Sequence, residues 1–403
     1  MATTSAPALA AAEAHRADVT SLLRDLVHTP SPSAGEQDVV TLLSARMEDL
    51  GYDEVVLDPF GSVIGRIGSG PTVIVMDSHI DTVGVGSRDE WSRDPFEPAL
   101  LDGVVYGRGS CDDKGGMAAM LYGAVLARAE LPEEVTLYVV GSVQEEDCDG
   151  LALEHVLTKA LPRPDVVVLG ESTNGQVFRG NRGRIEVLVR VKGSSCHASA
   201  PSLGRNPVYG LAPIIAEVEA LNHRLGHDEL LGAATVALTK IECETPSLNA
   251  VPSTATVYLD RRLTAGDDPD AALAEIAALP SVQRAGGTVE LLTYERTSFT
   301  GMRLGQEKRF ATWSLDADAP AVRAGLATVS AALGRPHPST GSWVFSTNGV
   351  ASMGKLGIPT IGFGPGDERY AHTVAEQCPV QDLVDAVAWY AAFPAQFVKE
   401  VGR

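Results

Sequence analysis

The chain lacks the features that mark secreted and membrane-spanning proteins. Its five cysteines are an odd number, lie far apart and include no Cys-x-x-Cys pair, which argues against a disulfide framework. The N-terminus has no basic segment ahead of an apolar core, and no apolar run approaches the roughly 20 residues that cross a bilayer. These absences predict a cytoplasmic protein without a membrane partner.

Positive charge is also scarce. The sequence holds 32 Lys and Arg against 52 Asp and Glu, a formal net charge of −20. Because nucleic acids and anionic membranes repel such a chain, we expect neither as a partner. At 403 residues, 44% of them hydrophobic, the chain is long enough to form two domains with packed cores.

Short Val-rich runs alternate with helical stretches in the first and last parts of the chain. The apolar runs span residues 72–76, 135–143, 165–169 and 358–363, and the helical stretches span 19–27, 116–130, 151–161 and 319–333. Near-continuous apolar strands separated by helices are typical of a buried, mostly parallel sheet with helices on both faces. We therefore predict an α/β domain.

The pattern changes around residue 184. Strands are predicted at 185–191, 234–241, 254–262 and 288–294, with helices at 208–225 and 269–279. This order, β-α-β-β-α-β, is the split ferredoxin-like motif. We predict a discontinuous domain of residues 1–183 and 297–403, interrupted by an inserted domain of residues 184–296.

His79 and Asp81 follow directly after the first apolar run. Residues two apart leave the same face of a strand, so the imidazole can bind a metal while the carboxylate orients it. In isolation, such a pair is more often an ordinary hydrogen-bonded contact. Its place at the end of a strand matters, because α/β sheets bind ligands beyond the carboxyl ends of their strands.

Further acidic and imidazole side chains follow later strands or lie in glycine-rich turns. They are Asp112 and Asp113 in the turn 107–116, Glu145 and Glu146 after the run 135–143, Glu171 after the run 165–169, and His372 in the segment 362–373. The aspartates could instead cap a helix, and the glutamates could be a solvated surface run. Carboxylate and imidazole ligands without thiolate favour zinc, with cobalt or manganese as substitutes. The number of candidates suggests two ions.

Five motifs, in this order, resemble those of a zinc-dependent metallopeptidase family. That family includes aminoacylase-1, acetylornithine deacetylase, succinyl-diaminopimelate desuccinylase and carboxypeptidase G. The motifs are SHIDTV at 78–83, GRGSCDDKG at 107–115, EE at 145–146, GEST at 170–173 and AHT at 371–373. The resemblance covers nearly the whole chain, and its details are most similar to the branch of selenium-metabolism-linked hydrolases.

The resemblance implies two zinc ions bridged by Asp112, with a cis peptide bond after it. One ion would also be held by His79 and Glu171, and the other by Glu146 and His372. It further implies an inserted domain that serves as a lid and forms a homodimer.

Other residues carry catalytic roles that the resemblance implies. Asp81 would orient His79, and Glu145 would be the general base that takes a proton from water and returns it to the leaving amine. His197, in the inserted domain, would donate to the developing oxyanion, often from the partner subunit. As a lone loop histidine it would otherwise be structural.

Several positions resemble substrate-binding residues of the family. Asn249 would be a second lid residue, and Arg262 would bind a substrate carboxylate, for which its planar guanidinium is suited. A buried structural ion pair is the alternative for Arg262. A polar segment that could line the pocket, or simply open a helix, consists of Ser346, Thr347, Asn348 and Gly349.

The predicted function is hydrolysis of the amide bond of an N-acyl amino acid or small peptide with a free carboxylate. A carboxypeptidase or dipeptidase would share every motif, and a catalytically silent ligand-binding protein is a further alternative. A cysteine hydrolase is disfavoured because the adjacent Cys196 and His197 point apart on an extended chain. A serine hydrolase is disfavoured because the sequence has no Gly-x-Ser-x-Gly elbow.

Overall fold

The computed structural model describes residues 7–402. Its largest sheet has nine strands. Four central strands run parallel, in the order β6 (Val135–Ser142), β3 (Thr72–His79), β7 (Val166–Leu169) and β20 (Thr360–Gly362). The predicted parallel sheet is thereby confirmed at its centre.

Both edges of this sheet are mixed. On one side, β2 (Val63–Gly68) and β1 (Glu54–Leu57) continue it in antiparallel fashion. On the other, β8 (Val177–Asn181) is antiparallel to β20 and pairs with both β18 (Trp313–Ser314) and β19 (Thr340–Trp343). A short turn joins β1 to β2, whereas α9 (Pro320–Leu333) lies between β18 and β19 in the chain.

Helices cover both faces of the large sheet, as predicted. Along β3, Ile74 and Met76 point into one hydrophobic core, whereas Val73 and Val75 point into another on the opposite face. The first core is closed by α1 (Pro7–Ala14), α2 (Arg16–His28), α3 (Gln37–Asp49), α4 (Lys114–Ala127), α9 (Pro320–Leu333) and α10 (Val380–Val401), and the second by α5 (Leu151–His155). No helix within residues 7–402 is both long and apolar enough to cross a membrane.

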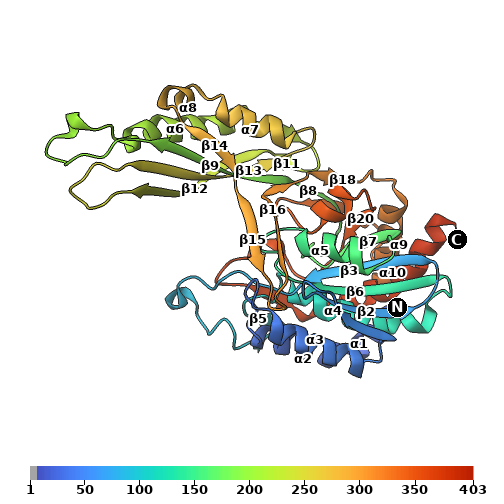
Figure 1. The fold of residues 1–403 in the computed structure, drawn as a ribbon. Coiled ribbons are helices and arrows are strands. Elements are labelled where there is room, and N and C mark those ends of the chain that lie inside the picture. The colour runs from blue at the N-terminus through green and yellow to red at the C-terminus, as the bar shows by residue number, and fades with distance from the viewer. Residues whose placement is uncertain (1–6, 403) are drawn as a thin grey trace.

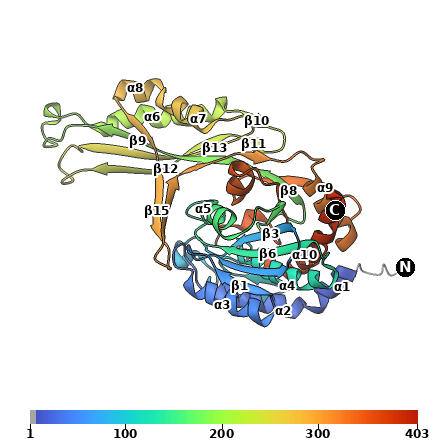
Figure 2. The same cartoon turned by 45° about the vertical axis from the view of Figure 1, so that its right-hand side comes forward.

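A second, five-stranded sheet lies over the large one (Figure 1). Its path is β12 (Thr235–Glu244), β13 (Thr254–Leu263), β9 (Gly183–Lys192) and β14 (Thr288–Leu291), all antiparallel. Numbered along the chain, these strands lie in the order 2-3-1-4, which fits the predicted ferredoxin-like motif. Figures 1 and 2 show its helices on the face away from the large sheet, namely α6 (Pro207–Leu221), α7 (Pro269–Ala277) and α8 (Pro280–Ala285).

A hairpin of β15 (Thr293–Thr297) and β16 (Arg303–Glu307) runs from the second sheet down to the large domain (Figure 1). After it, β17 (Arg309–Phe310) returns to pair with β9 as the fifth strand of the second sheet. The division proposed at residues 296 and 297 therefore falls within a hairpin that contacts both domains.

Candidate active site

The candidate ligands meet at one edge of the large sheet because three neighbouring parallel strands end there. His79 is the last residue of β3, the turn with Glu145 and Glu146 follows β6, and Glu171 comes two residues after β7. Asp112 enters from the turn before α4. His372 joins them from the loop after β20. The structure thus brings together all five residues that were expected to bind metal.

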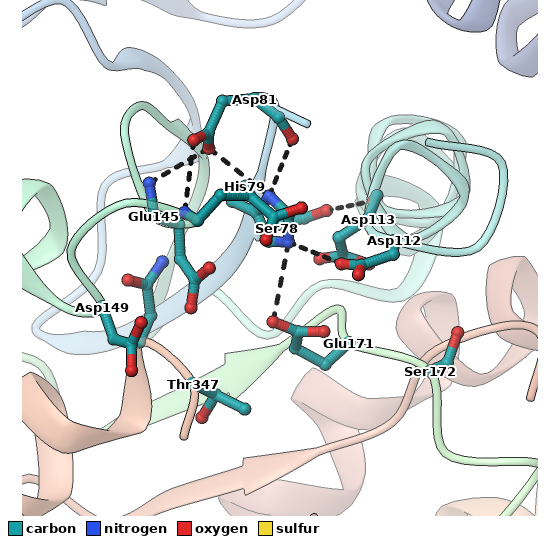
Figure 3. A network of polar contacts seen from close by, with 12 residues as sticks. Ser78, His79, Asp81, Asp112, Asp113, Glu145, Asp149, Glu171, Ser172 and Thr347 are labelled. Carbon is teal, nitrogen blue, oxygen red and sulfur yellow. Dashed lines mark hydrogen bonds and ion pairs between the residues drawn. The ribbon is translucent and has the colours of Figure 1, made fainter. Parts of the chain in front are cut away.

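Asp112 lies between the two histidines. Its Oδ1 is 2.9 Å from Nε2 of His79, and its Oδ2 is 3.1 Å from Nε2 of His372. Glu171 approaches His79 to 3.7 Å, and Glu146 lies 2.9 Å from His372. Figure 3 shows His79 with its contacts to Asp81, Asp112 and Glu171. Each histidine therefore lies beside a carboxylate of its own, Glu171 or Glu146, and both histidines contact the shared Asp112. The peptide bond after Asp112 is cis.

The donor set fits divalent metal. Ligand atoms of His79, Asp112 and Glu146 all lie within 4.8 Å of one another, as do those of His79, Glu145 and Glu171. Burial raises the pKa of Glu146 and, well above its usual value, that of Glu171, and repulsion from Asp112 adds to both. Cations would relieve this repulsion, and imidazole with carboxylate but no thiolate is a ligand set that zinc accepts.

The carboxylates around the two imidazoles favour the protonated form of each ring. Hydrogen bonds to Asp112 and Glu146 raise the pKa of His372 to about 10. Burial opposes charge on His79, but contacts with Asp112 and Asp81 still raise its pKa well above the usual value. Burial also opposes ionisation of Asp112, yet hydrogen bonds from His372 and His79 hold its pKa well below the usual range. Because a metal ligand must be a neutral imidazole, a cation that binds here competes with protons for His79 and His372.

Asp81 is fully buried and contacts more of the site than the sequence suggested. Nδ1 of His79 lies 3.0 Å from the main-chain oxygen of Asp81 and 3.4 Å from its Oδ1. The same carboxylate accepts hydrogen bonds from the backbone N–H groups of Glu145, at 3.0 Å, and Glu146, at 3.2 Å. It also accepts one from the hydroxyl of Ser33 at 2.6 Å. Asp81 thus fixes the turn that carries Glu145 and Glu146 as well as the ring of His79.

A cavity of about 210 Å³ opens beside this cluster. It is lined by Asp112, Glu145, Glu146, Asp149, Glu171, Arg184, Arg262, Phe345, Ser346, Glu368, Ala371 and His372. The sequence did not single out Asp149 or Arg184, whose side chains pair at 2.8 Å, with Ser346 donating a hydrogen bond to Asp149. The sequence does show an acidic run after β6 and a basic residue at the start of β9. The pairing of Asp149 with Arg184, however, depends on how the two sheets are placed.

Arg262 reaches this cavity from β13 of the second sheet. Its Nε and Nη2 donate to Asp260 at 2.7 and 2.9 Å. Its Nη1 is buried and has no hydrogen-bond partner among residues 7–402. The guanidinium therefore forms an ion pair and still has a donor for a further acceptor.

Of the predicted polar segment, residues 346–349, only Ser346 lines the cavity, and the other three are packed in the interior. Ser346 lines the cavity, whereas the Thr347 hydroxyl donates to Asn181 at 2.8 Å. The Asn348 amide donates to Asp77 at 2.8 Å and to Ser142 at 2.9 Å. A side chain at Gly349 would meet the ring of Trp313, since its Cβ would lie 2.4 Å from Cζ2. Contact of the last three with substrate stays a prediction.

His197 and Asn249 lie together, but they do not line the cavity. Both are exposed, His197 pairs with Ala250 in a short antiparallel bridge, and Ala198 N–H donates to the Asn249 carbonyl at 2.9 Å. Their loops follow β9 and join β12 to β13. Figures 1 and 2 show these loops at the end of the second sheet that extends away from the large sheet.

The chain is similar to known proteins over most of its length. A family model described as peptidase family M20/M25/M40 matches residues 75–396, which include every candidate metal ligand. The protein YgeY of Escherichia coli K12 is 44% identical over 388 residues, 96% of each chain. A succinyl-diaminopimelate desuccinylase of Stenotrophomonas maltophilia K279a is 30% identical over 377 residues, 91% of this chain and 95% of that one. In fold, the M20 family metallo-carboxypeptidase Sso-CP2 of Sulfolobus solfataricus matches with a TM-score of 0.73 at 22% identity, over 94% of this chain and 99% of that one.

Asp81→Asn should weaken metal binding by about 10–100-fold. Only the oxygen of an amide accepts hydrogen bonds, so the variant would lose the one from the N–H group of either Glu145 or Glu146. Chelator competition measures this affinity. Asp58→Asn is the matched control, since Asp58 also accepts from two backbone N–H groups and contacts a histidine, His155, outside the site. Equal metal affinity of the two variants would contradict the role of Asp81.

Proposed function

The chain belongs to peptidase family M20/M25/M40 and is a metal-dependent amidohydrolase, and we propose that it removes acyl groups from N-acyl amino acids or cleaves small peptides with a free carboxylate. One observation carries this proposal: the Asp112 carboxylate lies between two imidazole–carboxylate pairs, with Glu145 beside them. Such an arrangement fits two metal ions and a base at a single amide bond.

Zinc is the metal that we propose. His79, Glu171 and Asp112 would hold one ion, and Glu146, His372 and Asp112 the other. The chemistry supplied by the bound metal is polarisation of the amide carbonyl and a lowered pKa for water. The chain's own contribution is to hold the ligands in place through Asp81.

Glu145 is the proposed general base. Burial raises its pKa well above the usual value, although His79 opposes the shift, so the carboxylate readily accepts a proton. One of its oxygens, Oε1, is buried without a hydrogen-bond partner among the described residues, which leaves it available to water in the site. After attack on the carbonyl, Glu145 would return the proton to the leaving amine.

Arg262 is the proposed site for the substrate carboxylate. Its unpartnered Nη1 and its place on the cavity wall support this role, because guanidinium groups bind carboxylates strongly. The cavity of about 210 Å³ suits a small substrate. The similar desuccinylase and metallo-carboxypeptidase support both an acyl and a peptide substrate.

A homodimer formed through the second sheet is the proposed assembly. His197 and Asn249 are exposed and do not line their own chain's cavity, and their loops lie at the far end of that sheet, so in this proposal a partner subunit supplies them. In a symmetric dimer, each subunit would then complete the other's site.

Glu145→Gln should lower turnover of N-acetyl amino acids by about 10²–10⁴-fold, because the amide cannot accept the proton. Elemental analysis should still find two equivalents of metal. Glu154→Gln, a change at a half-buried residue of α5 that pairs with Lys355, should leave turnover unchanged. A metal-loaded Glu145→Gln protein as active as the wild type would overturn the mechanism.

Arg262→Lys should raise KM for N-acetyl amino acids and dipeptides by about tenfold, since an ammonium group lacks the planar set of donors with which Arg262 binds Asp260 and still presents Nη1. The matching carboxamide substrates should be unaffected. Arg261→Lys is the control, because Arg261 is the adjacent buried arginine and pairs with Glu275. If the preference for the free carboxylate survives in Arg262→Lys, Arg262 does not bind it.

The ratio of acyl to peptide turnover in the wild type separates a deacylase from a peptidase.

His197→Ala should keep its metal and fold but lose most turnover. Mixing it with Glu145→Gln protomers should restore part of the activity, because a mixed dimer contains one site with an intact Glu145 and the partner's intact His197. Activity that stays absent in verified mixed dimers would show that His197 does not act across the dimer. Full turnover of His197→Ala alone would refute its role.

A further inference from the structure

Two side chains of the β15–β16 hairpin reach the turn that carries Glu145 and Glu146. Tyr294 and Gln306 are directly opposite each other in the hairpin, so their side chains leave the same face. The Tyr294 hydroxyl donates to the side-chain oxygen of Gln144 at 2.6 Å. The Gln306 amide donates to Cys148 Sγ at 3.2 Å and to the Asp149 carbonyl at 3.4 Å. The pair therefore contacts both ends of this turn, with Glu145 and Glu146 between them.

The turn has a backbone that needs such support. Gln144 has a φ of +57°, in the left-handed region that residues other than glycine rarely adopt, and its side chain is fully buried. On the side of the large sheet, Glu36 accepts from Gln144 N–H at 3.0 Å and Asp81 from Glu145 N–H at 3.0 Å. The hairpin supplies hydrogen bonds to the side chains of Gln144 and Cys148 and to the Asp149 carbonyl.

The hairpin is itself fixed at both ends. At its tip, the Ser298 hydroxyl donates to the Phe60 carbonyl at 2.5 Å and the Thr300 hydroxyl to the Pro59 carbonyl at 2.7 Å. At its base, Leu292 N–H donates to the Glu186 carbonyl of the second sheet at 2.9 Å. Tyr294 and Gln306 are thus held between the two domains rather than on a free loop.

We infer that the Tyr294–Gln306 pair positions the general base Glu145. Neither residue lines the cavity, so both act through the turn and not on substrate. The inference rests on the proposed role of Glu145. A misplacement of about 1 Å can cost roughly 10²-fold in rate. Loss of the hydrogen bonds from either Tyr294 or Gln306 should therefore lower kcat while substrate binding is kept.

Tyr294→Phe in the metal-loaded protein should lower kcat on the order of tenfold, with KM within about twofold and two equivalents of metal retained. Hydrogen–deuterium exchange should speed up in the peptide that spans residues 144–149. Tyr52→Phe is the matched control, because Tyr52 is also buried and donates its hydroxyl, to the Leu121 carbonyl at 3.1 Å, away from the site. It should change neither kcat nor exchange in that peptide.

Gln306→Met removes the hydrogen bonds of the Gln306 amide at similar side-chain volume and should lower kcat in the same way. This second variant keeps the test informative if the first folds poorly. A kcat within twofold of wild type in both folded variants would overturn the inference, as would a loss explained by lost metal. Glu145→Gln measured alongside separates the two proposals. If that variant is active, the proposed base is wrong, whereas if it is inactive and both hairpin variants are normal, only the positioning role fails.

Discussion

One buried carboxylate, that of Asp81, joins the two parts on which the chemistry depends. It lies beside the ring of His79 and accepts the backbone N–H groups of Glu145 and Glu146. His79, a candidate metal ligand at the end of β3, and Glu145, the proposed base in the turn after β6, are thereby held in one geometry. A buried carboxylate is unfavourable unless its oxygens accept hydrogen bonds. A shift of the turn after β6 would therefore cost the hydrogen bonds that Asp81 accepts from Glu145 and Glu146.

The fold makes this geometry available by ending three parallel strands at the same edge, and glycine lets the loops beyond them meet. A Cβ at Gly364 would lie 1.8 Å from the Gly170 carbonyl oxygen, so the loop that leads to His372 can approach the one that carries Glu171 only because residue 364 has no side chain. The backbone approach and the ligand pairing around Asp112 therefore depend on each other. A larger residue at Gly364 would push His372 away from Asp112 and Glu146.

The sequence predicted those parts of the site that depend on local pattern. His79, Glu145 and Glu171 follow apolar runs, and a strand end is a place that periodicity alone can locate. The contacts across domains were not predictable in this way. The Asp149–Arg184 pair and the Tyr294–Gln144 hydrogen bond join residues far apart in the chain, and both depend on how the second sheet sits over the first. The hairpin itself was missed because the run 288–294 is two strands, β14 and β15, that belong to different sheets.

The cavity has walls of opposite character, which gives the substrate a direction. The large sheet supplies carboxylates such as Asp112 and Glu171, which attract metal, whereas the second sheet supplies the guanidinium groups of Arg184 and Arg262. Each guanidinium is paired with a carboxylate, Arg184 with Asp149 and Arg262 with Asp260, and each keeps a buried nitrogen without a hydrogen-bond partner among residues 7–402. On the proposed function, the substrate carboxylate would point toward the second sheet and the amide toward the metals. Because the hairpin that contacts the Glu145 turn is hydrogen-bonded to both domains, it would oppose a movement of the second sheet relative to the first.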